Sequence, residues 1–399
     1  MTMNPNLDRL QRYPFERLNA LLADVTPPAL APVNLGIGEP KHAPPAFIGD
    51  TLAASLDGLG RYAGTGGTPE LRNTLCRWLE RRFALGDGAL DPDANVLPAA
   101  GTREALFAIT QAVAAGRPDA LVLMPNPCYQ IYEGAALLAG AEPIYLNTIA
   151  DTGYLPDLDA VPESTWRQCA VIYICSPGNP SGAVLPEAWL RKLIALADAH
   201  DFVIAADECY SELYPDEERP PLGLLEVCAR MGRTGFHRCV VFHSLSKRSN
   251  VPGLRSGFVA GDADILEGFL RYRTYQGSAL PLHVQQASRA AWDDEAHVRH
   301  NRSRYRAKFD TALAILRPVL DVDMPDAGFY LWPRTPVDDV TFARTLYEQE
   351  NVRVLPGSYL SREANGINPG AGHVRMALVA DEAECEEAMR RIRRCVERL

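Results

Sequence analysis

The chain has 399 residues, of which 47% are hydrophobic and 23% charged, and its formal net charge is −10. This length predicts two domains or one large one, with ample material for a core. The acidic balance argues against nucleic acid or an anionic membrane surface as the main partner, and no apolar run is long enough to cross a bilayer. The nine cysteines form no C-x-x-C pair and no zinc-type spacing, so we expect reduced thiols, no metal site and a cytoplasmic protein.

Short apolar runs alternate with helical patterns through the middle of the chain. The runs predict strands at Ala120–Met124, Ala170–Cys175, Phe202–Ala206 and Cys239–His243, with Arg255–Ala260 as a fifth that could be an antiparallel edge. Helical patterns separate most of them, for example at Glu104–Ala115 and Glu187–His200. We therefore expect an α/β fold with a mostly parallel central sheet sandwiched by helices.

The last third of the chain has a different pattern. Its expected strands are joined by Gly/Pro turns and lie near Asp321–Met324, Gly328–Trp332, Val352–Leu355 and Val374–Val379. A final helix is acidic in its first turns and basic in its later ones, which suits the helix dipole. We predict a large domain over residues 45–285 and a smaller α+β domain over residues 1–44 and 286–399.

The segment His243-Ser244-Leu245-Ser246-Lys247 directly follows a predicted strand. Ligands of open α/β sheets lie beyond the carboxyl ends of strands, where a partly desolvated lysine has a lowered pKa and can act as a nucleophilic amine. The two serines and Arg255, eight residues after the lysine, could bind a phosphate. A solvated surface lysine is the alternative. The S-x-x-K motif of penicillin-binding proteins also matches, but the S-D-N and K-T-G motifs of that family are absent.

Two more features lie at the carboxyl ends of predicted strands, and a third opens a predicted helix. Asp207 ends a buried strand, where a pyridinium nitrogen could supply the cation that it needs, and Tyr210 lies one turn beyond. The loop Ser176-Pro177-Gly178-Asn179-Pro180-Ser181-Gly182 holds the amide of Asn179 rigidly. Gly101-Thr102-Arg103 opens a helix and offers free N–H groups to a phosphate. Taken singly, these could be a helix cap, an ordinary turn and an N-cap.

Two residues point to flat or anionic ligands. Tyr129 follows a strand and could stack on a cofactor ring, although a core tyrosine is the more frequent case. Arg375 lies within an apolar strand and needs an anionic partner, either a substrate carboxylate or an internal salt bridge.

Together these segments resemble the class I/II, aspartate-aminotransferase-like enzymes of fold type I, which use pyridoxal phosphate. The resemblance runs from Asn34-Leu35-Gly36-Ile37-Gly38-Glu39-Pro40 to Arg375. Its most specific parts are Tyr62-x-x-x-x-Gly67, the PGNPSG loop, the Asp207-x-x-Tyr210 pair and the spacing from SLSK to Arg255.

The resemblance implies a role for each matched residue. Lys247 forms the Schiff base with the cofactor, Asp207 pairs with the ring nitrogen, and Asn179 and Tyr210 contact the ring oxygen, while Tyr129 stacks on the ring. The implied phosphate ligands are Gly101, Thr102, Arg103, Ser244, Ser246 and Arg255. Tyr62 reaches the phosphate of the neighbouring subunit, which implies a homodimer. The substrate carboxylate meets Arg375, Asn179 and the backbone of Gly38.

A narrower resemblance comes from the tract K-R-S-N-x-P-G-L-R-S-G after Ser246, and from the opening Met3-Asn4-Pro5-Asn6-Leu7, followed by Tyr13-Pro14-Phe15. Both look like the succinyldiaminopimelate aminotransferases of bacterial lysine biosynthesis. This implies ping-pong transamination between N-succinyl-LL-2,6-diaminopimelate and 2-oxoglutarate. The alternatives are an aspartate, aromatic or acetylornithine aminotransferase, or a lyase or synthase on the same fold. A second carboxylate could be bound by any of several cations, namely Arg271, Arg273, Lys41, His42 and Arg362, which could equally be solvated charges.

Overall fold

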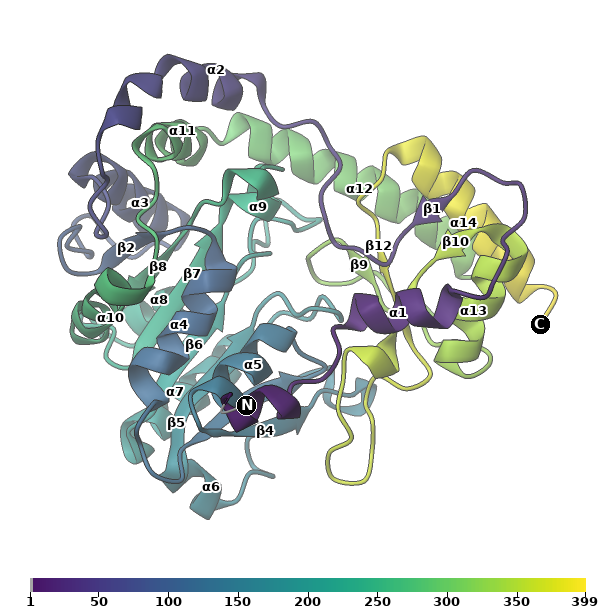
Figure 1. Ribbon diagram of the computed structural model, residues 1–399, viewed down its shortest axis with the longest axis horizontal. Helices are drawn as coiled ribbons and strands as arrows, with labels where there is room; N and C mark the ends of the chain where they lie inside the picture. The colour runs from purple at the N-terminus through teal and green to yellow at the C-terminus, as the bar shows by residue number, and fades with distance from the viewer. Residues whose placement is uncertain (1–2) are drawn as a thin grey trace.

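The computed structural model describes residues 3–399 and is built on a seven-stranded sheet (Figure 1). The strands lie in the order β2 (Val96–Ala99), β8 (Gly257–Gly261), β7 (Cys239–Ser244), β6 (Val203–Asp207), β5 (Cys169–Cys175), β3 (Leu121–Asn126) and β4 (Glu142–Asn147). β8 runs in the opposite direction to the other six strands. The predicted α/β class and mostly parallel sheet are confirmed.

Helices cover both faces of this sheet, and alternate strand residues enter two different cores. On β5, Ile172 and Ile174 face one core while Val171 and Tyr173 face the other. The first core is covered by α3 (Pro69–Arg82), α7 (Glu187–His200), α8 (Leu224–Arg230) and α11 (Leu282–Asp293). The second is covered by α4 (Thr102–Ala114), α5 (Gln130–Leu138) and α10 (Ala263–Gln276). Burial on both faces explains why these strands are continuous apolar runs.

The last third of the chain builds a third core around two small sheets. One has the order β11 (Leu355–Pro356), β12 (Val374–Ala377), β9 (Tyr330–Leu331), and the other pairs β1 (Val33–Asn34) with β10 (Val352–Arg353). The helices of this core are α12 (Ala296–Leu316), α13 (Asp339–Glu350) and α14 (Glu382–Val396). The β1–β10 pair joins the N-terminal segment to this part. The division into domains at residues 44 and 285 stays a prediction.

Four short helices complete the described chain, namely α1 (Pro14–Leu22), α2 (Ala46–Ala54), α6 (Glu163–Gln168) and α9 (Leu245–Arg248). Short 3-10 turns lie at Pro5–Arg9, Leu56–Gly60, Ala150–Thr152, Pro252–Leu254 and Gly357–Tyr359. Within residues 3–399, no helix has both the length and the apolar character that a membrane crossing requires.

Three expectations about strands need correction. The strand expected at Arg255–Ala260 is β8, which is antiparallel but lies inside the sheet, because β2 pairs with its outer side. Both true edge strands, β2 and β4, escaped the sequence analysis because each carries a proline (Pro98, Pro143), as edge strands tolerate. Asp321–Met324 forms no strand; acidic residues interrupt it and Pro325 follows.

Candidate functional site

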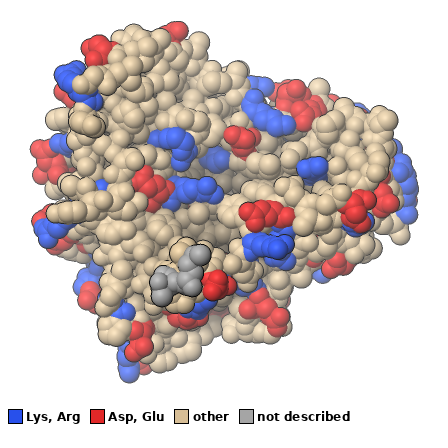
Figure 2. All heavy atoms as spheres, in the orientation of Figure 1, with Lys and Arg blue, Asp and Glu red and all other residues tan. Residues whose placement is uncertain are grey.

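A cavity of about 540 Å³ lies at the carboxyl ends of β5, β6 and β7, between the large sheet and strands β9 and β12. This volume is in the range of small-molecule sites. Its cationic lining residues are Arg103, Lys247, Arg255 and Arg375, and its acidic ones are Glu39 and Asp207. Four cations against two acids make the cavity positive although the chain is acidic. On the face in Figure 2, lysine and arginine side chains border the hollowed centre.

Lys247 projects into the cavity from α9, the single helical turn that follows β7. The side chain of Ser244 caps this turn by accepting a hydrogen bond from the N–H of Ser246 (3.1 Å). The Nζ atom of Lys247 donates to the carbonyl oxygen of Gly38. Burial lowers the pKa of Lys247 to about 8, so a sizeable share of the amine is neutral near pH 7, as a nucleophile requires.

Asp207 ends β6 and is only 5% exposed. Its Oδ2 accepts a hydrogen bond from the hydroxyl of Tyr132 (2.6 Å), and its Oδ1 accepts one from the N–H of Cys209 (3.2 Å). Burial raises the pKa of Asp207, against the effect of these bonds. Among residues 3–399 the carboxylate enters no ion pair, so a cation in the cavity would stabilise it.

Arg375 lies on β12 and is 4% exposed. Its guanidinium donates to the side-chain oxygen of Asn179 (3.0 Å) and to the carbonyl of Gly36 (2.8 Å), and it lies 4.5 Å from the ring centroid of Tyr330. Within the described chain it makes no salt bridge, and its Nε has no hydrogen-bond partner. The alternative of an internal salt bridge is therefore wrong, and the buried cation is available to an anionic ligand.

Asn179 and Tyr210 also reach the cavity. Because the Asn179 side-chain oxygen accepts from Arg375, its amide N–H groups remain for other partners. The hydroxyl of Tyr210 lies 3.0 Å from that of Tyr330 on β9. Burial raises the pKa of Tyr210, so its hydroxyl stays protonated and can donate.

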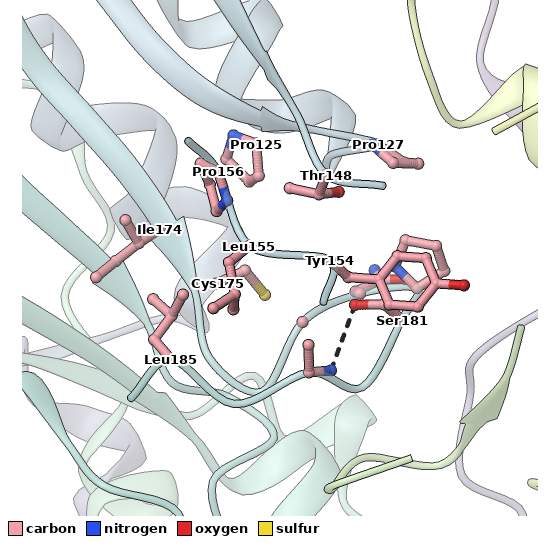
Figure 3. Close-up of a pocket in the computed structure, with 14 residues that line it drawn as sticks. Pro125, Pro127, Thr148, Tyr154, Leu155, Pro156, Ile174, Cys175, Ser181 and Leu185 are labelled. Carbon is pink, nitrogen blue, oxygen red and sulfur yellow. Dashed lines mark hydrogen bonds between the residues drawn. The ribbon is translucent and has the colours of Figure 1, made fainter. Parts of the chain in front are cut away.

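The loop that carries Asn179 is held by its own hydrogen bonds. The N–H of Gly178 donates to the carbonyl of Ala183 (2.8 Å), and the N–H of Gly182 donates to the carbonyl of Gly178 (2.8 Å). Figure 3 shows the bond from the N–H of Ala183 to the hydroxyl of Ser181, beside a second cavity behind the loop. That cavity measures only about 30 Å³, room for a water molecule or two rather than a substrate.

The expected phosphate ligands meet at one end of the main cavity. Thr102, Ser244, Ser246 and Arg255 line it. Gly101 lies directly behind, because a Cβ added to it would come within 2.0 Å of the Arg255 guanidinium, and its φ of +89° favours glycine. It precedes α4, whose N-terminal N–H groups and dipole favour an anion.

Arg103 lines the cavity, but its side chain turns toward aromatic hydroxyls. It donates to the hydroxyl of Tyr129 (3.0 Å) and to that of Tyr13 (2.9 Å). Tyr129 itself lines the cavity, as expected for a residue that stacks on a ligand ring.

Tyr62 does not line the cavity of its own chain and is fully exposed. The five cations considered for a second carboxylate do not line it either. Arg271 pairs with Glu267, Arg273 with Glu104, Lys41 with Glu384 and Arg362 with Glu133, while His42 bonds to Asn301. None of these five is directed at the site.

Three cavity tyrosines, Tyr13, Tyr132 and Tyr330, were not assigned roles from sequence. Tyr132 lies one helical turn after Tyr129 on α5, and this spacing was the only signal for it. Tyr330 comes from β9, 120 residues from its partner Tyr210, and no local pattern distinguishes it from a core residue.

The residues present fit pyridoxal phosphate. Asp207 is a buried carboxylate with no cationic partner among residues 3–399, which suits a protonated ring nitrogen, and Lys247 offers a partly neutral amine. The helix that begins after Gly101 suits the phosphate, since a side chain at Gly101 would displace the Arg255 guanidinium.

Comparison with known proteins gives the same picture. Residues 31–392 match the model of the family "aminotransferase class I and II". An LL-diaminopimelate aminotransferase of Nitratidesulfovibrio vulgaris is 32% identical over 97% of each chain. An aminotransferase structure from Neisseria meningitidis is 47% identical, covers 98% of this chain and 99% of its own, and superposes with a TM-score of 0.94. A probable N-succinyldiaminopimelate aminotransferase from Thermus thermophilus is 28% identical over 96% of this chain and 100% of its own, with a TM-score of 0.84.

The family match covers most of the chain, and the relatives match over nearly its full length in both sequence and fold. The chain belongs to the class I and II aminotransferases, which depend on pyridoxal phosphate.

Proposed function

We propose that this aminotransferase converts N-succinyl-LL-2,6-diaminopimelate and 2-oxoglutarate to N-succinyl-2-amino-6-oxopimelate and glutamate. The observation that carries the chemistry is one cavity that holds a lysine, a buried Asp207 and a buried Arg375, of which the last two have no oppositely charged partner within the described chain. The K-R-S-N-x-P-G tract and the Thermus thermophilus neighbour support the succinylated substrate.

In this proposal the charges of Asp207 and Arg375 are each paired with a group of the cofactor or the substrate. Asp207 would pair with the cofactor ring nitrogen, Arg375 would bind the α-carboxylate bidentately, and Asn179 would donate to the ring oxygen. When bound, pyridoxal phosphate supplies an electron sink for charge that develops at the substrate Cα.

Lys247 serves two purposes here. Its amine would hold the cofactor, and its Nζ, when not engaged in that link, would take the proton from the substrate Cα as general base. The pKa of about 8 places this amine near working pH, where such a base is most effective. The rigid loop around Asn179 and the β12 backbone keep the substrate carboxylate in one orientation relative to Nζ.

The substrate is tested by supplying two amino donors, each with 2-oxoglutarate, and measuring glutamate. We expect a kcat/KM for N-succinyl-LL-2,6-diaminopimelate at least about tenfold above that for unmodified LL-diaminopimelate, a difference of ~1.4 kcal/mol. The reverse preference would discard the succinyl assignment and leave the aminotransferase.

That reverse outcome is the second candidate function. Several relatives of 30–32% identity over nearly the full chain are named LL-diaminopimelate aminotransferase. They support a diaminopimelate-type substrate whether or not it is succinylated.

We also propose that the active unit is a homodimer. Tyr62 is fully exposed, and the exposed apolar residues Leu56, Leu59 and Tyr275 are at least half accessible. Tyr62 can reach a cofactor phosphate only if a second copy presents its cavity to it. Sedimentation should therefore give twice the 43.8 kDa of the chain, and Tyr62→Ala should weaken cofactor binding; a monomer with full activity contradicts the proposal.

A further inference from the structure

The residues after Lys247 in the K-R-S-N tract have no part in the reaction as described. Arg248, Ser249 and Asn250 are all buried. Each of them contacts the segment that runs from the last turn of α11 into the first turns of α12, residues 291–301. Because three consecutive side chains contact the same segment, we infer that they have a shared structural role.

Arg248 fixes the start of this contact. Its guanidinium donates to the carbonyl of Ala291 (2.6 Å) and to the carboxylate of Glu295 (2.7 Å). It also lies over two adjoining indole rings, 4.8 Å from the centroid of Trp292 and 5.6 Å from that of Trp78. The aromatic contacts together with the hydrogen bonds of its N–H groups hold this planar cation in one orientation.

Ser249 and Asn250 continue the contact along α12. The hydroxyl of Ser249 lies 2.8 Å from Nε2 of His297. The amide of Asn250 donates to the side-chain oxygen of Asn301 (3.0 Å), and the φ of +54° at Asn250 directs it there.

Asn301 is the junction of the network. Besides Asn250, its oxygen takes a hydrogen bond from Nδ1 of His42 (2.8 Å), and its own amide points at the main-chain oxygen of Lys247 (3.4 Å). Both Nε2 of His42 and Oδ1 of Asn250 are buried without a partner in the described chain. A buried polar atom without a hydrogen-bond partner lowers the stability of the fold, so apolar side chains at these positions would make the protein more stable. The network therefore serves to fix the position of the segments that it joins.

We propose that Asn301 is a positioning residue for Lys247, and that Arg248, Ser249 and Asn250 form with Glu295, His297 and Asn301 an α9–α12 clamp that sets the direction of the lysine side chain. A helix of one turn, like α9, cannot hold its own geometry. In contrast, α12 has 21 residues and is anchored in the third core. The inference rests on the role proposed for Lys247.

The test compares holoenzymes of three variants. Asn301→Ala removes the junction, and Asn250→Gly removes one arm while keeping the positive φ. Asn351→Ala is the matched control: Asn351 is a buried asparagine with a φ of +52°, bonded to the carbonyl of Leu30 away from the cavity. The readouts are the pH midpoint of the visible band of the lysine-linked cofactor and the rate of cofactor release.

We expect Asn301→Ala and Asn250→Gly to shift the midpoint by about 0.5 pH unit or more and to speed release about fivefold or more. Asn351→Ala should lower the melting temperature and leave both readouts unchanged. Wild-type midpoint and release in both clamp variants would overturn the proposal. If Asn301→Ala does not fold, Asn250→Gly decides alone. A wild-type protein with no visible band would instead refute the role of Lys247.

Discussion

The lowered pKa of Lys247 gives the most direct test of the site. A fall from 10.5 to about 8 corresponds to ~3 kcal/mol against the charged amine. At pH 7 roughly 9% of such an amine is neutral, compared with roughly 0.03% of an ordinary lysine. Water in the cavity screens part of this cost, so we expect an excess of neutral amine on the order of 100-fold.

The assay is competitive acylation of the cofactor-free protein with a small uncharged reagent, read by mass spectrometry for each lysine. The chain has only four lysines, Lys41, Lys192, Lys247 and Lys308. Lys41 and Lys192 are exposed and serve as internal references within the same sample. We expect the labelling rate of Lys247 to level off above a midpoint near pH 8 while the references keep rising.

The result is decided by the pH midpoint of labelling and not by the absolute labelling rate. Restricted access of the reagent to the cavity lowers the rate by the same factor at every pH and leaves the midpoint unchanged. If Lys247 follows the references to a midpoint above pH 10, burial does not neutralise the amine and its proposed part in catalysis loses its physical basis. Leu in place of Arg375 provides a check of the cause: removing this neighbouring cation, which lowers the Lys247 pKa, should move the midpoint upward.

Three further predictions follow from single contacts. Tyr132→Phe removes a hydrogen bond to the Asp207 carboxylate that contributes ~1.5–3 kcal/mol. Fluorescence titration of the cofactor-free variant should therefore show cofactor binding at least about tenfold weaker than in the wild type, and an unchanged affinity would contradict this. Arg103→Gln should raise KM for the succinylated substrate more than it weakens cofactor binding, because its guanidinium bonds to tyrosine hydroxyls in the cavity. A larger effect on cofactor binding than on KM would support the phosphate role expected from the sequence. Burial lowers the pKa of Lys308 to about 8, below its value in the unfolded chain, so the free energy of unfolding of the wild type in urea should rise between pH 8 and 10.5. Lys308→Met should remove up to ~3 kcal/mol of that rise. An equal rise in both proteins would show that Lys308 does not cause it.

The central strands could be predicted because strands buried on both faces consist almost entirely of apolar residues. β5, β6 and β7 are covered on both faces, so each is an unbroken apolar run between turns. The edges carry weaker signals: β2 and β4 each contain a proline and are four and six residues long. A strand's neighbours in the sheet leave no mark on its own sequence, which is why β8 was expected at an edge.

The same reasoning explains which site residues were predictable. Asp207, Asn179 and Lys247 each follow a parallel strand, and the carboxyl ends of parallel strands meet at one edge of a sheet. Tyr330 reaches the cavity from a different sheet. Its place depends on how β9 packs against Tyr210, a contact that spans 120 residues.

Charge connects these observations to the substrate. A chain with a net charge of −10 repels anions at long range, but its cavity brings together four cations and two acids. In the proposed reaction, a phosphate at Arg255 and an α-carboxylate at Arg375 would use two of the cations, and Lys247 would be taken up by the covalent link to the cofactor. Arg103 is then the one cation lining the cavity, among residues 3–399, that no ligand of the common chemistry requires. A substrate with a further carboxylate, such as a diaminopimelate derivative, would give that charge a partner, whereas a monocarboxylic amino acid would leave it to the tyrosine hydroxyls alone.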